Sequence, residues 1–113
     1  MASSVASRKA KARRLQQAVV EAILELYPEL TERDVKSVPM GVSGPDIELS
    51  QKGFELFPFA VESKNQEKIS IWEALKQTTS EAREGTPLLV FSRNRSEVYC
   101  ALRFEDFLKL LRR

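Results

Sequence analysis

Gly44-Pro45-Asp46-Ile47-Glu48-Leu49 and Phe59-Ala60-Val61-Glu62-Ser63-Lys64 are the two stretches that decide the fold we expect. Polar and apolar residues alternate from Asp46 to Leu49, and this period of two is typical of a short β-strand. Side chains also alternate between the two faces along the second stretch, so Glu62 and Lys64 share the face opposite Val61.

The segment between these stretches, Gln51-Lys52-Gly53, has the composition of a turn. We therefore expect a longer second strand from Phe54 to Ser63 and a hairpin between the two strands. Such a pairing places Asp46 beside Glu62, on the face opposite the apolar side chains.

Helical spacing of apolar residues predicts three helices around these strands. The first runs from about Arg8 to Tyr27 and ends at Pro28. The second covers about Ile71 to Glu84, between a capping box formed by Ser70 with Glu73 and a terminal Gly85. The third carries Phe104, Phe107, Leu108 and Leu111.

Two further apolar strands are expected at residues 86–92 and 97–102, joined by the turn Arg93-Asn94-Arg95. The resulting order is α-β-β-α-β-β-α. It predicts an α/β fold in which helices flank a mixed central sheet.

Length and composition indicate one domain. The chain has 113 residues, of which 42% are hydrophobic and 30% charged, as in ordinary globular proteins. No apolar run approaches the length of a membrane span, and the N-terminus lacks the apolar core of a signal peptide. The single cysteine, Cys100, cannot form an intramolecular disulfide. We therefore expect a cytoplasmic protein without membrane contact.

The complete absence of histidine narrows the possible chemistry. It excludes Ser-His-Asp and Cys-His catalysis, zinc sites with imidazole ligands, and nuclease mechanisms with a histidine base. Carboxylates, lysine and cations that prefer oxygen ligands remain.

Basic residues are concentrated near the N-terminus. Residues 1–14 contain Arg8, Lys9, Lys11, Arg13 and Arg14 and no acid, although the net charge of the whole chain is only +2. We expect residues 1–14 to form a partly flexible basic arm that contacts phosphate groups, ahead of a single domain over residues 15–113. A merely solubilising tail is the alternative interpretation.

Asp46, Glu62 and Lys64 are the expected catalytic group. Two carboxylates at bonding distance repel each other unless a cation lies between them, and Mg²⁺ prefers such oxygen ligands. A divalent ion lowers the pKa of its bound water and so allows attack on phosphorus. Lys64 would orient or deprotonate that water, or stabilise the transition state as a cation; the sequence leaves both roles open.

Gly44-Pro45-Asp46-Ile47 and Glu62-Ser63-Lys64 resemble the two halves of the PD-(D/E)xK nuclease motif. The chain is particularly similar to phage and archaeal Holliday-junction-resolvase-like members, in which a glycine-rich loop precedes the aspartate and a helix with a glutamine, here Gln77, follows the ExK strand. The resemblance covers roughly residues 15–102 and implies a restriction-endonuclease-like core. It also allows a phage-encoded protein that acts in the host cell.

The resemblance further implies an activity. Asp46, Glu62 and the main-chain carbonyl of Ser63 would bind Mg²⁺ or Mn²⁺, and a homodimer would hydrolyse phosphodiester bonds in branched DNA. Many such nucleases add an acid from the first helix; Glu21 is the best match, with Glu25 and Gln17 as rivals.

Further candidate DNA contacts are Ser43, Lys68, Arg93 and Arg95. Trp72 is interpreted as a packing residue rather than a base-stacking one. Two other functions remain open, because an E-x-K triplet can also be a surface ion pair. One is a catalytically inactive nucleic-acid-binding module on the same fold, and the other is a protein-interaction domain.

Overall fold

The computed structural model describes residues 4–112, which form a molecule with principal extents of 47 × 30 × 26 Å. In chain order, its elements are α1 (Val5–Leu26), β1 (Val35–Ser37), β2 (Ile47–Leu49), α2 (Gln51–Leu56), β3 (Phe59–Asn65), α3 (Ile71–Glu81), β4 (Thr86–Ser92), β5 (Tyr99–Ala101) and α4 (Phe104–Leu111).

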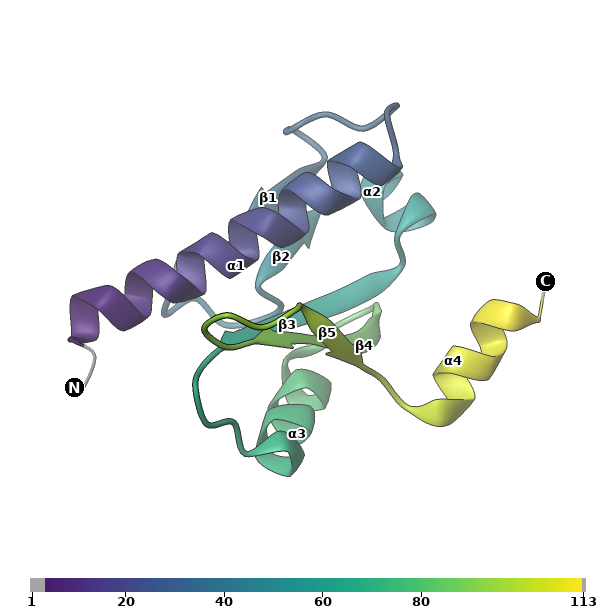
Figure 1. Cartoon of the computed structure of the whole chain (residues 1–113). Coiled ribbons are helices and arrows are strands. Elements are labelled where there is room, and N and C mark those ends of the chain that lie inside the picture. Colours follow the sequence, from purple (N-terminus) through teal and green to yellow (C-terminus); the bar gives the residue numbers. More distant parts are fainter. Residues whose placement is uncertain (1–3, 113) are drawn as a thin grey trace.

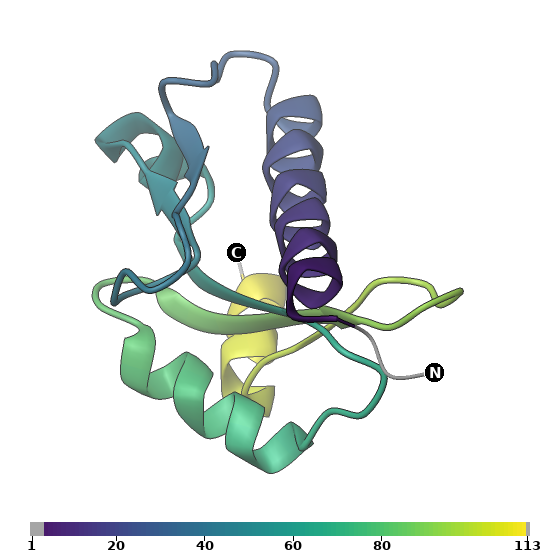
Figure 2. The same cartoon turned by 90° about the vertical axis from the view of Figure 1, so that its left-hand side faces the viewer.

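The strands form two sheets. β3 pairs in parallel with β4, which pairs antiparallel with β5, so the larger sheet is mixed; β1 and β2 form a separate antiparallel pair. Figure 2 shows α1 on one side of the larger sheet and α3 on the other. The chain therefore has the predicted α/β fold, with helices flanking a mixed sheet.

The core lies between α1 and the strands. Leu15, Val20 and Ile23 of α1 pack with Val61 of β3 and Val90 of β4. Ser4 is the N-cap of this helix, and its hydroxyl accepts a hydrogen bond from the Ser7 amide at 3.0 Å, which satisfies one of the free amides of the first turn. The basic segment that was expected to form an arm thus belongs, from residue 5 onward, to the first turns of α1.

The predicted hairpin between residues 46–49 and 54–63 is wrong. Residues 51–56 form α2, because Ser50 caps this short helix by accepting a hydrogen bond from the Gly53 amide at 3.0 Å. β2 pairs with β1, not with β3. Asp46 nevertheless lies against β3, since its amide donates to the Val61 carbonyl at 2.8 Å.

The later elements follow the prediction more closely. α3 begins at Ile71 as expected but ends at Glu81, before Gly85. Ser70 is its N-cap without a side-chain hydrogen bond, so the expected capping box is not formed. The strand at 86–92 and the helix from Phe104 to Leu111 are confirmed, and the strand between them is shorter than predicted.

α4 differs from the other helices in its surroundings. Figure 1 shows it, in yellow, at one end of the molecule and well separated from α1 and α3. None of its residues is buried. Within residues 4–112, no helix has the length and apolar character needed to cross a membrane.

Candidate functional site

A cleft of about 1090 Å³ opens between the N-terminal half of α1, the loop at residues 40–44, the end of β3 and one face of α3. Asp46, Glu62 and Lys64 all line it. The three residues predicted from the two motif stretches therefore lie at one site, even though the hairpin that was expected to bring them together does not exist.

Asp46 is held rigidly at the edge of this cleft. Its carboxylate accepts hydrogen bonds from the amide and the hydroxyl of Ser63, at 2.8 and 3.4 Å. Its carbonyl accepts from the Val38 amide at 2.8 Å and from Gln16 Nε2 at 3.0 Å. Burial raises the pKa of Asp46 above its ordinary value, and the Ser63 amide partly opposes this by stabilising the charged form.

Glu62 is the most unusual residue of the site. It is only 5% exposed, and its Oε1 has no hydrogen-bond partner among the described residues. Its Oε2 lies 3.8 Å from Lys64 Nζ, which confirms that the two side chains share one face of β3. Burial, with the Asp46 carboxylate as the next cause, raises the pKa of Glu62 from 4.5 to about 7.

Sequence reasoning missed a third acid at this site, Glu81 of α3. It lines the cleft, and its Oε2 accepts a hydrogen bond from the Gly44 amide at 2.5 Å. Its negative charge contributes to the raised pKa values of both Asp46 and Glu62. The available signal was Gln77, which also lines the cleft, because residues four positions apart lie on the same face of a helix.

The structure does not bring Glu21 to the two carboxylates. Glu21, Glu25 and Gln17 are all exposed, and none of them lines the cleft. The face of α1 that lines it runs through Arg8, Ala12 and Gln16, and five further residues turn a helix by about 1.4 turns, which carries Glu21 away. The buried Gln16 holds the position nearest the site and donates to the carbonyls of Asp46 and Val38.

Apart from Lys11, which lines the cleft but is buried, the predicted DNA-binding residues fall into two groups. Arg8, Lys9, Ser43 and Lys68 line the cleft. Arg13 and Arg14 on α1, together with Arg93 and Arg95 in the turn between β4 and β5, are exposed outside it. Positive charge therefore surrounds one end of the cleft, on the side of the α1 N-terminus.

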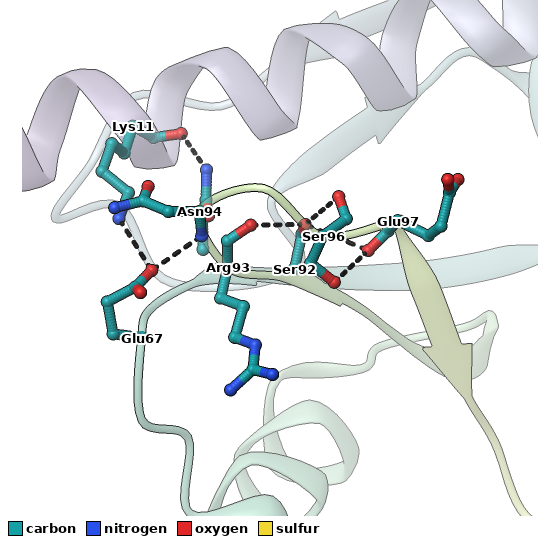
Figure 3. A network of polar contacts seen from close by, with 8 residues as sticks. Lys11, Glu67, Ser92, Arg93, Asn94, Ser96 and Glu97 are labelled. Atoms are coloured by element: carbon teal, nitrogen blue, oxygen red, sulfur yellow. Dashed lines mark hydrogen bonds and ion pairs between the residues drawn. The ribbon is translucent and has the colours of Figure 1, made fainter.

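Lys11 has a structural role and does not present a free positive charge at the surface. Its side chain is 9% exposed and its Nζ lies 3.5 Å from Glu67 Oε2. Figure 3 shows this ion pair. The same Glu67 oxygen accepts from the Asn94 amide at 2.7 Å, and the Lys11 carbonyl accepts from Asn65 Nδ2 at 3.0 Å. These bonds fix the turn at residues 93–95 beside the first half of α1.

Trp72 is 80% exposed, so it does not pack in the core of the described chain. Only its position near the start of an otherwise amphipathic helix had suggested burial.

The donor set at the cleft fits a hard divalent cation. Asp46 and Glu62 provide carboxylates from adjacent segments, and the unpartnered Glu62 Oε1 leaves a buried lone pair that a cation would satisfy. The part of the chain that the structure describes contains no group of three or more Asp, Glu, Cys or His side chains placed to hold a metal ion. Two carboxylates and a main-chain carbonyl such as that of Ser63 are therefore the ligands available.

Comparisons of the chain with models of known protein families, with curated protein sequences and with solved structures found no match.

Proposed function

We propose that this chain is a Mg²⁺- or Mn²⁺-dependent endonuclease of the PD-(D/E)xK type, with a restriction-endonuclease-like fold. The observation that carries the proposal is the buried Glu62, which has an unpartnered Oε1 and lies in one cleft with Asp46 and Lys64. A carboxylate in such surroundings is stabilised when a cation neutralises it. Structural ion pairs seldom leave a buried oxygen without a partner.

Asp46, Glu62 and the Ser63 carbonyl would hold the ion. When bound, a divalent ion supplies Lewis acidity and a water of lowered pKa for attack on a phosphodiester. Ser63 and Gln16 fix the carboxylate and the carbonyl of Asp46 through the hydrogen bonds described above, so this ligand is positioned before any substrate enters.

Lys64 is positioned to take a direct part in the reaction. Its side chain is 21% exposed and its Nζ lies 3.8 Å from Glu62 Oε2, so the ammonium group borders both the carboxylates and the open cleft. From there it can hold a water molecule by hydrogen bonding, or stabilise negative charge on the phosphoryl oxygens.

The charges around the cleft favour a nucleic-acid substrate. Arg8, Lys9 and Lys68 line the same cleft as the two acids, and cations around a metal site can hold the phosphates on either side of the cleaved bond. Such contacts carry no sequence information. We propose DNA as the substrate, and branched DNA in particular, on the basis of the resemblance to resolvase-like nucleases.

Cleavage assays with matched variants test the proposal. The purified chain is expected to nick supercoiled plasmid and to cut a labelled four-way junction in Mn²⁺ but not in EDTA. Glu62→Gln and Lys64→Met should each abolish this activity. Glu48→Gln and Lys36→Met make the same chemical changes at exposed positions of β2 and β1 and should leave it intact. Cleavage that survives both site substitutions would contradict the proposal.

A nucleic-acid-binding module without catalysis is the second candidate. It is favoured by Gln16, an amide where many PD-(D/E)xK nucleases present an acid from the first helix, and by the absence, among the described residues, of three Asp, Glu, Cys or His side chains placed to hold one metal ion. Such a module would bind four-way junctions with an affinity that falls steeply with salt, and would leave them uncut in either metal.

A further inference from the structure

Glu81, the last residue of α3, brings a third carboxylate to the cleft. Its Oε2 accepts a hydrogen bond from the Gly44 amide at 2.5 Å, two residues before Asp46 in the chain. Arg83, just beyond the helix, holds the same loop through a hydrogen bond from its guanidinium to the Ser43 carbonyl at 3.3 Å. These contacts tie the end of α3 to the segment that leads into Asp46, so the Glu81 carboxylate has a defined position beside the site.

Glu81 has no ion-pair partner. Within residues 4–112, no basic side chain forms an ion pair with it, whereas Lys64 lies 3.8 Å from Glu62. The negative charge of Glu81 also acts on the other two acids and raises the pKa of Asp46 and of Glu62. This part of the cleft therefore holds three carboxylates and one ammonium group, an arrangement that an added divalent cation would stabilise.

The buried Glu62 indicates independently that these acids leave room for a ligand. It is only 5% exposed, lines the same cleft and has an Oε1 without a hydrogen-bond partner among the described residues. Anchoring of the loop would by itself account for the bond between Glu81 and Gly44. It would not account for a buried carboxylate oxygen that lacks a donor, which in a folded protein usually has a partner.

We propose that Glu81 is the third acid of the metal site, in place of the acid that many PD-(D/E)xK nucleases take from their first helix. This role rests on the proposed function, because it concerns the same ion. In the part of the chain that the structure describes, no three acidic side chains are placed to hold one ion directly. Glu81 therefore acts through water molecules bound to the ion, which Mg²⁺ and Mn²⁺ usually retain, and its charge strengthens the binding of the ion.

Titration of the full chain with Mn²⁺ alone, without DNA, tests this role by isothermal titration calorimetry. Glu81→Gln keeps an oxygen that can accept from the Gly44 amide but removes the charge. It should weaken Mn²⁺ binding by about 10-fold, as is usual when a residue behind the direct ligands is lost. Glu84→Gln makes the same change three residues further on, at an exposed position outside the cleft, and should bind Mn²⁺ as the wild-type chain does.

Stability in EDTA separates this role from simple anchoring of the loop. Without an ion, Glu81→Gln removes a charge that repels the other two acids, so its urea midpoint should equal or exceed that of the wild-type chain. Arg83→Met removes the other contact between the end of α3 and the loop, and it should not weaken Mn²⁺ binding. Circular dichroism verifies that each variant is folded.

Wild-type affinity for Mn²⁺ in Glu81→Gln would overturn the proposal, as would an equal loss of affinity in Glu84→Gln. A lower urea midpoint for Glu81→Gln in EDTA, with Mn²⁺ binding weakened equally by Arg83→Met, would also overturn it, because Glu81 would then act only as an anchor.

The same measurements distinguish this role from the proposed function. If the wild-type chain binds Mn²⁺ and cleaves DNA while Glu81→Gln keeps full affinity for the ion, only the role of Glu81 fails. Binding of Mn²⁺ that depends on Glu81, in a chain that leaves DNA uncut, would contradict the nuclease activity alone. A wild-type chain that binds no Mn²⁺ would overturn both.

Discussion

The raised pKa of Glu62 makes the metal-free protein less stable as the pH increases. This carboxyl group has a pKa of about 7 in the folded chain, against an ordinary value of 4.5. Between these two values the folded state keeps a proton that the unfolded state has lost. The stabilisation is therefore complete below pH 4.5 and disappears as the pH rises toward 7.

The size of the effect follows from the same two values. A tenfold change in an acid dissociation constant corresponds to about 1.4 kcal/mol, so the difference between 4.5 and about 7 amounts to about 3 kcal/mol. Asp46, whose pKa is also raised, changes the stability in the same direction. Asp34 and Glu67 have lowered pKa values, and their contributions are lost only at more acidic pH. The change in the free energy of unfolding between pH 5 and pH 8 thus reflects mainly the carboxyl groups of Glu62 and Asp46.

Urea denaturation in EDTA, at a series of pH values, measures this difference. The free energy of unfolding of the wild-type chain should fall by about 3 kcal/mol between pH 5 and pH 8. Glu62→Gln should remove most of that fall, because an amide does not titrate, whereas Glu48→Gln on the exposed side of β2 should retain it. A wild-type protein that gains stability over this interval, or a Glu62→Gln variant with the wild-type slope, would refute the reasoning.

Two further substitutions test how the site is held in place. Gln16→Leu removes the side-chain donor of two partly buried main-chain carbonyls, of which that of Asp46 keeps the Val38 amide as a donor, and it should cost about 1–3 kcal/mol in urea denaturation. The same change at the exposed Gln17 should cost little, and equal losses would contradict the role given to Gln16. Gly44→Ala and Gly41→Ala both place a side chain at positive φ, at +100° and +87°, and each should lose about 1–2 kcal/mol. The two losses should be similar, because the carbon added at Gly44 meets only the flexible end of the Arg83 side chain and the carbon added at Gly41 meets nothing within 4 Å, so a loss confined to one of the two positions would be the contrary result.

The strand β3, which carries Glu62 and Lys64, is the part of the fold that the sequence predicts best. Glu62 and Lys64 share a face of β3 because side chains alternate along any strand, whatever that strand pairs with. The strand β4 and the helix α4 were predictable for a similar local reason, since β4 is an apolar run between Gly85 and the turn at residues 93–95, and α4 carries apolar residues at helical spacing. Local periodicity was sufficient for these elements.

Strand pairing and short elements were not predictable in this way. β1 contains three residues without a periodic pattern. Alternation predicted the equally short β2, but the pairing of the two strands depends on contacts between separate parts of the chain. α2 has six residues and a glycine at its third position, so its composition is that of a turn. Only the Ser50 cap distinguishes it from one.

The orientation of α1 explains why the sequence pointed to Glu21 as the residue of the first helix that completes the site. Leu15, Val19, Ile23 and Leu26 recur at helical spacing in the sequence, but Leu26 is 63% exposed and Val20 is buried. The real buried face is therefore rotated, and it brings Gln16 rather than Gln17 or Glu21 to the site. Glu81 escaped notice for a different reason: its proximity to Asp46 depends on how α3 packs against the sheet, which no local pattern reveals.

The binding of a divalent ion between Asp46 and Glu62 is the central claim, and a crystal soaked in Mn²⁺ tests it most directly. Anomalous scattering should show a manganese ion in contact with the carboxylates of Asp46 and Glu62 and with the Ser63 carbonyl, and this signal should vanish in crystals of Glu62→Gln. Manganese absent from the cleft, or bound there equally in Glu62→Gln, would contradict the account.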